Sequence, residues 1–287
     1  MNRFIYQFLL FVAAFFCVER FCHEQTDGFS MRKIRAQLPY NADYATSTPS
    51  LKKREQLEVI FSQPFYYLKS GGESYVFVSK DGHYVLKFFK HHHMRLNSPF
   101  DYFLPNILIK QRVHKLDTLF TSCKLAWTHF KKETALIYLH LNQSDDLLIP
   151  LTLYDRIGIR HKIDLDQYTF ALQKKASLAY PTLTALKEAQ ELDAAKKRLA
   201  SWVDLIVRRC QAGLVDHDAR KRNFGFIKEQ AIEIDLGSFT LDETIKSAEN
   251  TKKIVLAETK NLKQWIHKYH PELLDYLDEV VKETLEL

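Results

Sequence analysis

The chain has 287 residues, of which 46% are hydrophobic and 26% are charged, and these values are ordinary for a globular core. Eight glycines and eight prolines exclude collagen-like and low-complexity chains, while four scattered cysteines without a Cys-x-x-Cys pair exclude a disulfide scaffold and a cysteine-based zinc site. The formal net charge of +6 is too small for the dense basic stripe of a nucleic-acid-binding protein, so no nucleic acid is expected as a partner.

The first expected element is an apolar leader. Residues 4–18 read FIYQFLLFVAAFFCV after Arg3, which is the pattern of a secretory signal, but no small-x-small cleavage site ends the run. The run is also short for a spanning helix, which takes about 20 apolar residues. Because basic residues gather downstream, we expect residues 1–24 to be an uncleaved anchor that leaves the following domain in the cytoplasm, at a membrane surface. Export through a signal peptide and a mis-assigned start upstream of Met31 are the alternatives.

A linker and a group of strands are expected next. Residues 25–57 are polar and include a Thr-Ser-Thr-Pro-Ser run, which is typical of a loose linker. Residues 65–68 and 75–78 are rich in aromatic and β-branched side chains, as strands are. Asp81-Gly82 predicts a hairpin turn into a returning strand at residues 84–89.

The middle of the chain is expected to combine a long helix with two strands. Apolar residues at three- and four-residue steps predict a helix over residues 107–139. Residues 148–157 and 162–172 are expected to form strands. Together with the strands before them, these elements predict a β-rich N-lobe over residues 58–176.

The second half is expected to be mostly helical. An apolar stripe from Leu192 to Cys210 predicts a helix, and Gly213 suits the position just past its end. Two short strands, at residues 224–227 and 231–234, would form a hairpin. Helix is expected again over residues 258–287, with an interruption near Pro271. This order predicts an α+β architecture in two lobes, with a helical C-lobe over residues 177–287.

Three polar side chains are spaced around the expected hairpin. Asp218 and Asn223 lie five positions apart in the loop before its first strand, and Asp235 follows its second strand. The hairpin would bring Asn223 close to Asp235. Amide and carboxylate oxygens are hard ligands suited to Mg²⁺, so this pair is a candidate metal site. Asp218 could accept or orient a hydroxyl proton nearby.

This stretch resembles the protein-kinase-like superfamily, whose catalytic loop reads His-Arg-Asp-x₄-Asn and whose metal motif is Asp-Phe-Gly. The motifs stand here as Asp-His-Asp-Ala-Arg-Lys-Arg-Asn at residues 216–223 and as Asp-Leu-Gly at residues 235–237. The resemblance implies that Asp218 is the catalytic aspartate and that Asn223 and Asp235 hold metal. It also puts Arg220 in the place of a phosphate-contacting lysine. The chain departs from the family at the first two positions of the loop motif.

The first half carries further parts of the resemblance. Val85-Leu86-Lys87 resembles the Val-Ala-Ile-Lys strand, whose lysine holds the α- and β-phosphates of ATP. Alternation places Val85 on the same face as Lys87, where it could cover the adenine. The segment that contains Gly71, Gly72 and Val76 resembles the family's Gly-rich loop.

Two further assignments follow from the resemblance and from position in the chain. The family pairs its strand lysine with a helix glutamate, and Glu133 is the only glutamate between Phe88 and Pro150. With Glu133 as that partner, residues 90–105 would loop out as an insertion. By analogy, the adenine edge would meet the end of a strand near Gln173.

The length of chain after the metal motif bears on the type of kinase. Only 52 residues follow Asp235, and they contain no Ala-Pro-Glu segment. The chain therefore resembles compact kinases of sugars, lipids or small molecules, such as the lipopolysaccharide core kinases, as much as Ser/Thr protein kinases. The resemblance implies an ATP- and Mg²⁺-dependent phosphotransferase that moves the γ-phosphoryl group to a hydroxyl on a protein, a sugar or a lipid. The alternative is a pseudokinase, a nucleotide-binding scaffold without turnover.

Overall fold

The computed structural model describes residues 2–36, 38–91 and 106–286. These residues form an α+β protein, as the sequence predicts, and they divide into two compact units. Unit 1 comprises Met1–Arg112 and His140–Ala171, and unit 2 comprises Val113–Leu139 and Leu172–Leu287. Each unit therefore consists of two separate stretches of the chain.

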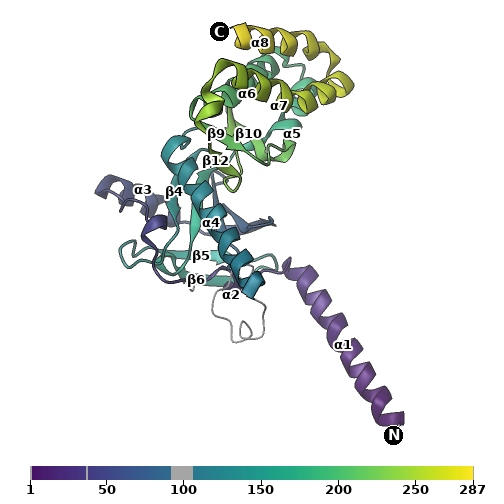
Figure 1. Ribbon diagram of the computed structural model, residues 1–287. Coiled ribbons are helices and arrows are strands. Elements are labelled where there is room, and N and C mark those ends of the chain that lie inside the picture. Colours follow the sequence, from purple (N-terminus) through teal and green to yellow (C-terminus); the bar gives the residue numbers. More distant parts are fainter. Residues whose placement is uncertain (1, 37, 92–105, 287) are drawn as a thin grey trace. The chain divides into compact units, whose positions relative to one another are not determined.

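Unit 1 is built on a curved sheet (Figure 1). Five of its strands neighbour one another in the order β3-β2-β1-β5-β6, and only β1 and β5 run parallel. Their bounds are Phe65–Ser70 for β1, Ser74–Ser79 for β2, Tyr84–Phe89 for β3, Pro150–Tyr154 for β5 and Arg160–Asp164 for β6. The turn into β3 has Gly82 at φ +75°, a conformation that glycine adopts without strain. The predicted hairpin is confirmed.

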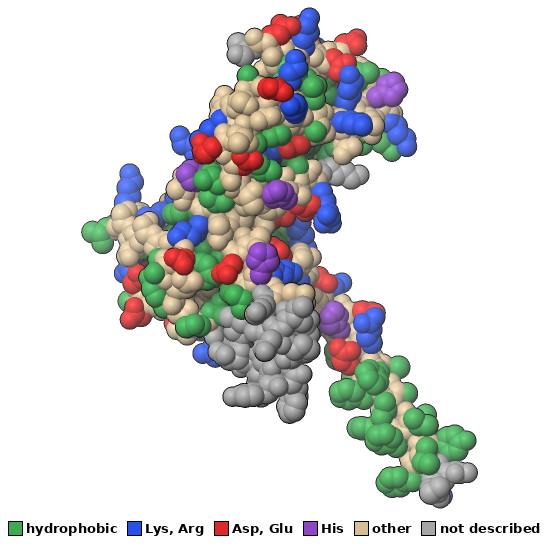
Figure 2. Space-filling model, in the orientation of Figure 1, with side chains coloured by type: hydrophobic (Ala, Val, Ile, Leu, Met, Phe, Trp, Pro, Cys, Tyr) green, Lys and Arg blue, Asp and Glu red, His purple; other side chains and the backbone are tan. Residues whose placement is uncertain are grey.

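Helix α1 (Asn2–Thr26) precedes this sheet, and its side chains are largely exposed. Figure 2 shows them as a row of hydrophobic groups along the helix. Among the described helices, the segment Arg3–Thr26 is the one that is long and apolar enough to cross a membrane. An anchor and a signal sequence both fit this finding.

Residues 25–57 are not the loose linker that their polarity indicates. They contain helix α2 (Met31–Ile34) and the start of helix α3 (Leu51–Phe61). Ile34 is fully buried, and the ring of Phe29 packs against Tyr75 with the centroids 5.2 Å apart. Just before Phe29, the carbonyl of Gly28 accepts a hydrogen bond of 2.7 Å from the Tyr75 hydroxyl. The segment is therefore part of unit 1, held by single apolar residues too widely spaced to form a periodic pattern.

Unit 2 is mainly helical. Its helices are α4 (Asn106–His129), most of which lies in this unit, α5 (Ala179–Glu188), α6 (Leu192–Gln211), α7 (Ala248–Tyr269) and α8 (Leu274–Glu286). The predicted apolar stripe of α6 is buried from Ala195 to Cys210, whereas Leu192 at the start of the helix is exposed. Gly213 follows the helix at φ +72°. A Cβ atom at Gly213 would lie 2.9 Å from the flexible end of the Lys246 side chain, which can shift, so the positive φ is what favours glycine there.

The structure corrects the helix predicted over residues 107–139. Helix α4 ends at His129, and strand β4 (Leu136–His140) follows a turn. All five residues of β4 are buried. A strand buried on both faces is a continuous apolar run, which periodicity cannot separate from a buried helix. Strand β7 (Phe170–Lys174) lies at the end of the second predicted strand region.

The predicted hairpin of unit 2 is present. Strand β10 (Phe224–Ile227) pairs with β11 (Gln230–Glu233) in antiparallel register, and β8 (Ser177–Leu178) adds to the other edge of β10. A second antiparallel pair joins β9 (Leu214–Asp216) to β12 (Phe239–Leu241). These two pairs place the loop after β9 beside the loop after β11.

Candidate functional site

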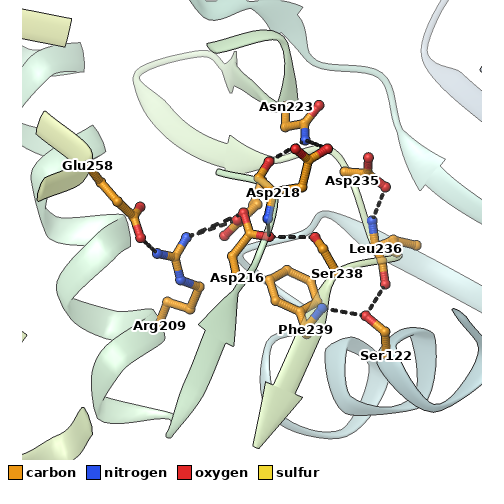
Figure 3. Close-up of polar contacts among 11 residues, drawn as sticks. Ser122, Arg209, Asp216, Asp218, Asn223, Asp235, Leu236, Ser238, Phe239 and Glu258 are labelled. Carbon is orange, nitrogen blue, oxygen red and sulfur yellow. Dashed lines mark hydrogen bonds and ion pairs between the residues drawn. The ribbon is translucent and has the colours of Figure 1, made fainter. Parts of the chain in front are cut away.

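The loop after β9 and the loop after β11 are joined by the side chain of Asp216 (Figure 3). Its Oδ1 atom accepts a hydrogen bond of 2.8 Å from the backbone N–H of Asp218 and one of 2.5 Å from the hydroxyl of Ser238. The ladder between β9 and β12 supports the same contact, because it pairs Asp216 with Phe239. Asp216 therefore fixes the two motifs to each other.

Asn223 lies where the sequence predicts it, between Asp218 and the end of the hairpin. Its Nδ2 atom donates to the backbone oxygen of Asp218 at 2.7 Å, and its own backbone oxygen accepts from the N–H of Ile234 at 2.6 Å. Asn223 is 6% exposed. Because Nδ2 is used within the loop, Oδ1 is the side-chain atom that can serve as a metal ligand.

Asp235 begins the second loop directly after Ile234. Its Oδ1 atom accepts hydrogen bonds from the backbone N–H of Leu236 at 2.8 Å and of Gly237 at 3.2 Å. These bonds orient the carboxylate, and neither of them uses Oδ2. The described residues hold no cluster of three or more His, Cys, Asp or Glu side chains arranged for a metal ion. A site of one amide and one carboxylate oxygen still fits Mg²⁺, which keeps several waters and phosphate oxygens in its shell.

The side chain of Arg220 lies against the proposed catalytic aspartate. Its Nε atom forms an ion pair with Oδ1 of Asp218. The Arg220 side chain is 65% exposed, so solvent screening keeps the pair weak. Arg220 thus engages one oxygen of the Asp218 carboxylate.

Helix α4 holds the loop after β11, which begins at Asp235, through a residue that sequence reasoning missed. The hydroxyl of Ser122 donates to the backbone oxygen of Leu236 at 2.6 Å and accepts from the N–H of Phe239 at 2.6 Å. Ser122 is fully buried. A serine inside a helical stripe gives no signal of such a role, because its partners lie more than 110 residues away in the chain.

We expect Ser122→Ala to loosen the loop, because two buried backbone groups would lose their partner. Such a loss costs about 1–3 kcal/mol in the free energy of unfolding. Urea unfolding measures it. Thr118→Ala is the matched control, since the Thr118 hydroxyl bonds only to the carbonyl of His114 in the same helix. An equal loss in both variants would show that Ser122 has no special role.

A buried ionic cluster lies behind Asp216 and was also missed. The guanidinium of Arg209 is fully buried, and its Nη1 atom lies 2.9 Å from Oε1 of Glu233 and 4.0 Å from Oδ2 of Asp216. Its Nη2 atom bonds to Oε1 of Glu258. Burial raises the pKa of both glutamates. A single buried cation therefore anchors the residue that joins the two loops.

Glu133 is not the helix glutamate that the resemblance implies. Helix α4 ends at His129, and Glu133 lies in the turn that follows it. Its carboxylate accepts a hydrogen bond of 3.1 Å from Nη1 of Arg208, and its backbone oxygen accepts from the N–H of Glu233 at 2.9 Å. The error follows from the helix predicted over residues 107–139, which was ten residues too long at this end.

The side chain of Gln173 is buried and bonded to the backbone of unit 2. It is 3% exposed, and its Nε2 atom donates to the backbone oxygens of Thr134 at 2.8 Å and of Ile234 at 3.2 Å. Ile234 precedes Asp235, so this bond of Gln173 helps to hold the start of the loop after β11. Its expected contact with the adenine edge cannot involve this amide nitrogen.

The remaining candidates lie in unit 1. Lys87 of β3 is paired across the ladder with Val76 of β2, and the turn between β1 and β2 contains Gly71 and Gly72. A nearby lysine, Lys90, was not foreseen. Its Nζ atom donates to the hydroxyl of Ser70 and the carbonyl of Gly71, at 2.6 and 2.5 Å, and so holds this turn.

Val85 also lies on β3, two positions before Lys87, as the alternation of the strand predicts. Most of the expected insertion over residues 90–105 lies outside the described residues.

Comparisons with known proteins give a coarse result. No protein-family model matches the sequence, and no curated protein does so. Among solved structures, the chain is similar to WbdD, with a TM-score of 0.36 and 16% identity over 77% of this chain and 46% of that one. A second WbdD structure, described as a bifunctional kinase-methyltransferase, has a TM-score of 0.31 and 16% identity over 73% and 43% of the two chains.

A third similar structure is the complex of Rv3197 with erythromycin from Mycobacterium tuberculosis, with a TM-score of 0.33 and 12% identity over 91% of this chain and 75% of that one. The chain spans less than half the length of the WbdD chains.

Proposed function

We propose that the protein is a phosphotransferase that moves the γ-phosphoryl group of ATP to a hydroxyl group in the presence of Mg²⁺. The observation that carries the proposal is the hydrogen-bonded arrangement of Asp218, Asn223 and the loop of Asp235. It joins one carboxylate that can act on a hydroxyl to two hard oxygen ligands within a single compact unit.

In this proposal some residues of unit 2 hold the metal ion and another acts on the acceptor hydroxyl. Oδ1 of Asn223 and the carboxylate of Asp235 hold Mg²⁺, which neutralises phosphate charge when bound. Asp218 orients the acceptor hydroxyl and takes up its proton. The acceptor oxygen forms a bond to the γ-phosphorus, the bond from that phosphorus to the β,γ-bridging oxygen breaks, and ADP leaves.

The nucleotide-binding part of the proposal falls on unit 1. Lys87 would offset the charge of the α- and β-phosphates, and Val76 and Val85 would contact the adenine. The turn of Gly71 and Gly72 would cover the phosphates, since a Cβ atom at Gly72 would meet nothing within 4 Å and that position is open to a ligand. Unit 1 then corresponds to a β-rich N-lobe and unit 2 to a truncated helical C-lobe.

A scaffold that binds nucleotide without turnover is the second candidate. The ion pair between Arg220 and Asp218 favours it, because it engages the carboxylate that phosphoryl transfer needs. Turnover distinguishes the two functions. The full chain is incubated with γ-labelled ATP, alone and with candidate acceptors, and both ATP consumption and autophosphorylation are followed.

We expect Asp235→Asn to lose most of the Mg²⁺-dependent part of ATP binding, because the substitution replaces the charged ligand with a neutral amide. Asp218→Asn should keep that part, because Asp218 acts on the acceptor. ATP is titrated against both variants and the parent, with Mg²⁺ and with EDTA. If Mg²⁺ strengthens ATP binding as much in Asp235→Asn as in the parent, the metal assignment is wrong.

A further inference from the structure

Unit 2 contains a cavity of about 430 Å³ beside the loop of Asp218. This volume is within the roughly 300–1,000 Å³ of small-molecule sites. The cavity is formed by α5, α6, α7 and the loop after β9, so it lies within one compact unit. Residues that define it include Tyr180, Trp202, Arg220, Glu258, Asn261 and Trp265.

Aromatic rings form one side of the cavity. The rings of Tyr180 and Trp265 meet edge to face with their centroids 4.5 Å apart, and those of Tyr180 and Trp202 do so at 5.7 Å. Trp202 packs in turn on Phe224 at 5.0 Å. Trp202 is buried, whereas Tyr180 and Trp265 are half-buried. The contacts fix the rings, and the two half-buried ones can offer surface to a ligand.

Polar side chains form the rest of the lining. Glu258 has one oxygen engaged by Arg209, while its Oε2 atom is buried without a hydrogen-bond partner. Asn261 is an exposed residue of α7 and also lines the cavity. Arg220 lines the cavity from the loop and is paired with Asp218. The cavity therefore combines stacking surfaces with hydrogen-bonding groups next to the proposed catalytic aspartate.

The charges around the cavity disfavour an anionic ligand. The carboxylate of Glu258 faces the guanidinium of Arg209, and the carboxylate of Asp218 faces that of Arg220. Glu258 shares the guanidinium of Arg209 with Glu233 and Asp216, so both guanidinium groups beside the cavity are already paired with carboxylates and offer little to an anionic ligand.

We propose that this cavity binds the acceptor and that the acceptor is a sugar or a similar ring bearing several hydroxyl groups. Such a ring offers C–H faces that pack on the rings of Tyr180 and Trp265 and hydroxyl groups that reach Glu258 and Asn261. A fatty chain would leave those polar groups unpaired, and an extended peptide would need a longer groove. The proposal rests on the proposed function, since the hydroxyl presented past Arg220 is the one from which Asp218 takes the proton.

Binding of methyl glycosides to the full chain tests the proposal. The chain is kept in a detergent without a sugar headgroup, and saturation-transfer NMR detects bound methyl glucoside, mannoside and galactoside without nucleotide. We expect at least one glycoside to bind. Trp265→Leu should weaken it by about tenfold or more, which corresponds to ~1.4 kcal/mol. Trp127→Leu is the matched control, because Trp127 is half-buried on α4 and does not line the cavity.

Each outcome decides one part of the proposal. If none of the glycosides binds to the parent, the ligand class is wrong. If a glycoside binds equally to Trp265→Leu and to the parent, its site is elsewhere. The binding assay contains no ATP, so it tests the cavity separately from turnover. If a glycoside binds at this cavity but is never phosphorylated when γ-labelled ATP is added, the phosphotransferase function is contradicted and the binding site stands.

Discussion

Asp218→Ala is expected to lower phosphoryl transfer by a factor on the order of 10² or more, as for other positioned acid–base groups. The affinity for ATP should change little, because Asp218 acts on the acceptor hydroxyl. The measurement is ATP consumption and autophosphorylation by the full chain, with nucleotide binding followed in parallel. The two readings together separate a loss of chemistry from a loss of binding.

A surface aspartate supplies the control for this variant. Asp278 lies on α8 and pairs with Lys263 at the protein surface, so Asp278→Ala should keep full turnover. If the parent consumes ATP and Asp218→Ala does so equally well, the proposed role of Asp218 is wrong. A parent that binds ATP but never consumes it supports the scaffold.

Arg209→Met is expected to lower the free energy of unfolding by about 3–5 kcal/mol, because it leaves buried carboxylates without their cation. Urea unfolding of the full chain measures the loss. Lys197→Met on the same helix is the control. Lys197 pairs with Glu229 in solvent, and the loss of an exposed pair costs about 0–1 kcal/mol. Equal losses in the two variants would contradict the anchoring role of Arg209.

The pH dependence of the Arg209→Met variant gives a second reading. Burial raises the pKa of Glu258 above its ordinary value of 4.5, so the folded chain holds a proton that the unfolded chain releases. Stability from this group is therefore present below about pH 4.5 and is lost as the pH rises toward the folded pKa. Without the cation the folded pKa should rise further, so the decline should extend to higher pH. Adding Glu258→Gln should flatten it and recover part of the stability, and an unchanged slope would contradict this account.

The parts of the fold that sequence predicted well are those set by nearby residues. The turn at Gly82, the strand beginning at Tyr84 and the stripe of α6 each depend on side chains a few positions apart. Asp218, Asn223 and Asp235 could be grouped for the same reason, because one short hairpin connects them. Local patterns were sufficient wherever the contacts were local.

The parts that sequence missed depend on distant contacts. Ser122 and Arg209 read as ordinary helix residues, yet each bonds to groups from other elements of unit 2. Glu133 was misplaced because the buried strand β4 reads like the end of a helix. In each case the role of the residue depends on which other element packs against it, and the spacing of residues along the chain does not predict that.

The junction between α1 and the sheet determines how far the protein can act from a bilayer. The chain just after α1 is fixed to the sheet by the hydrogen bond between Gly28 and Tyr75 and by the packing of Phe29. If α1 crosses a membrane, the sheet of unit 1 therefore stays close to the surface of that membrane. The acceptors it could meet would be those carried on the same bilayer or delivered to it, and freely dispersed molecules would have to come to the surface.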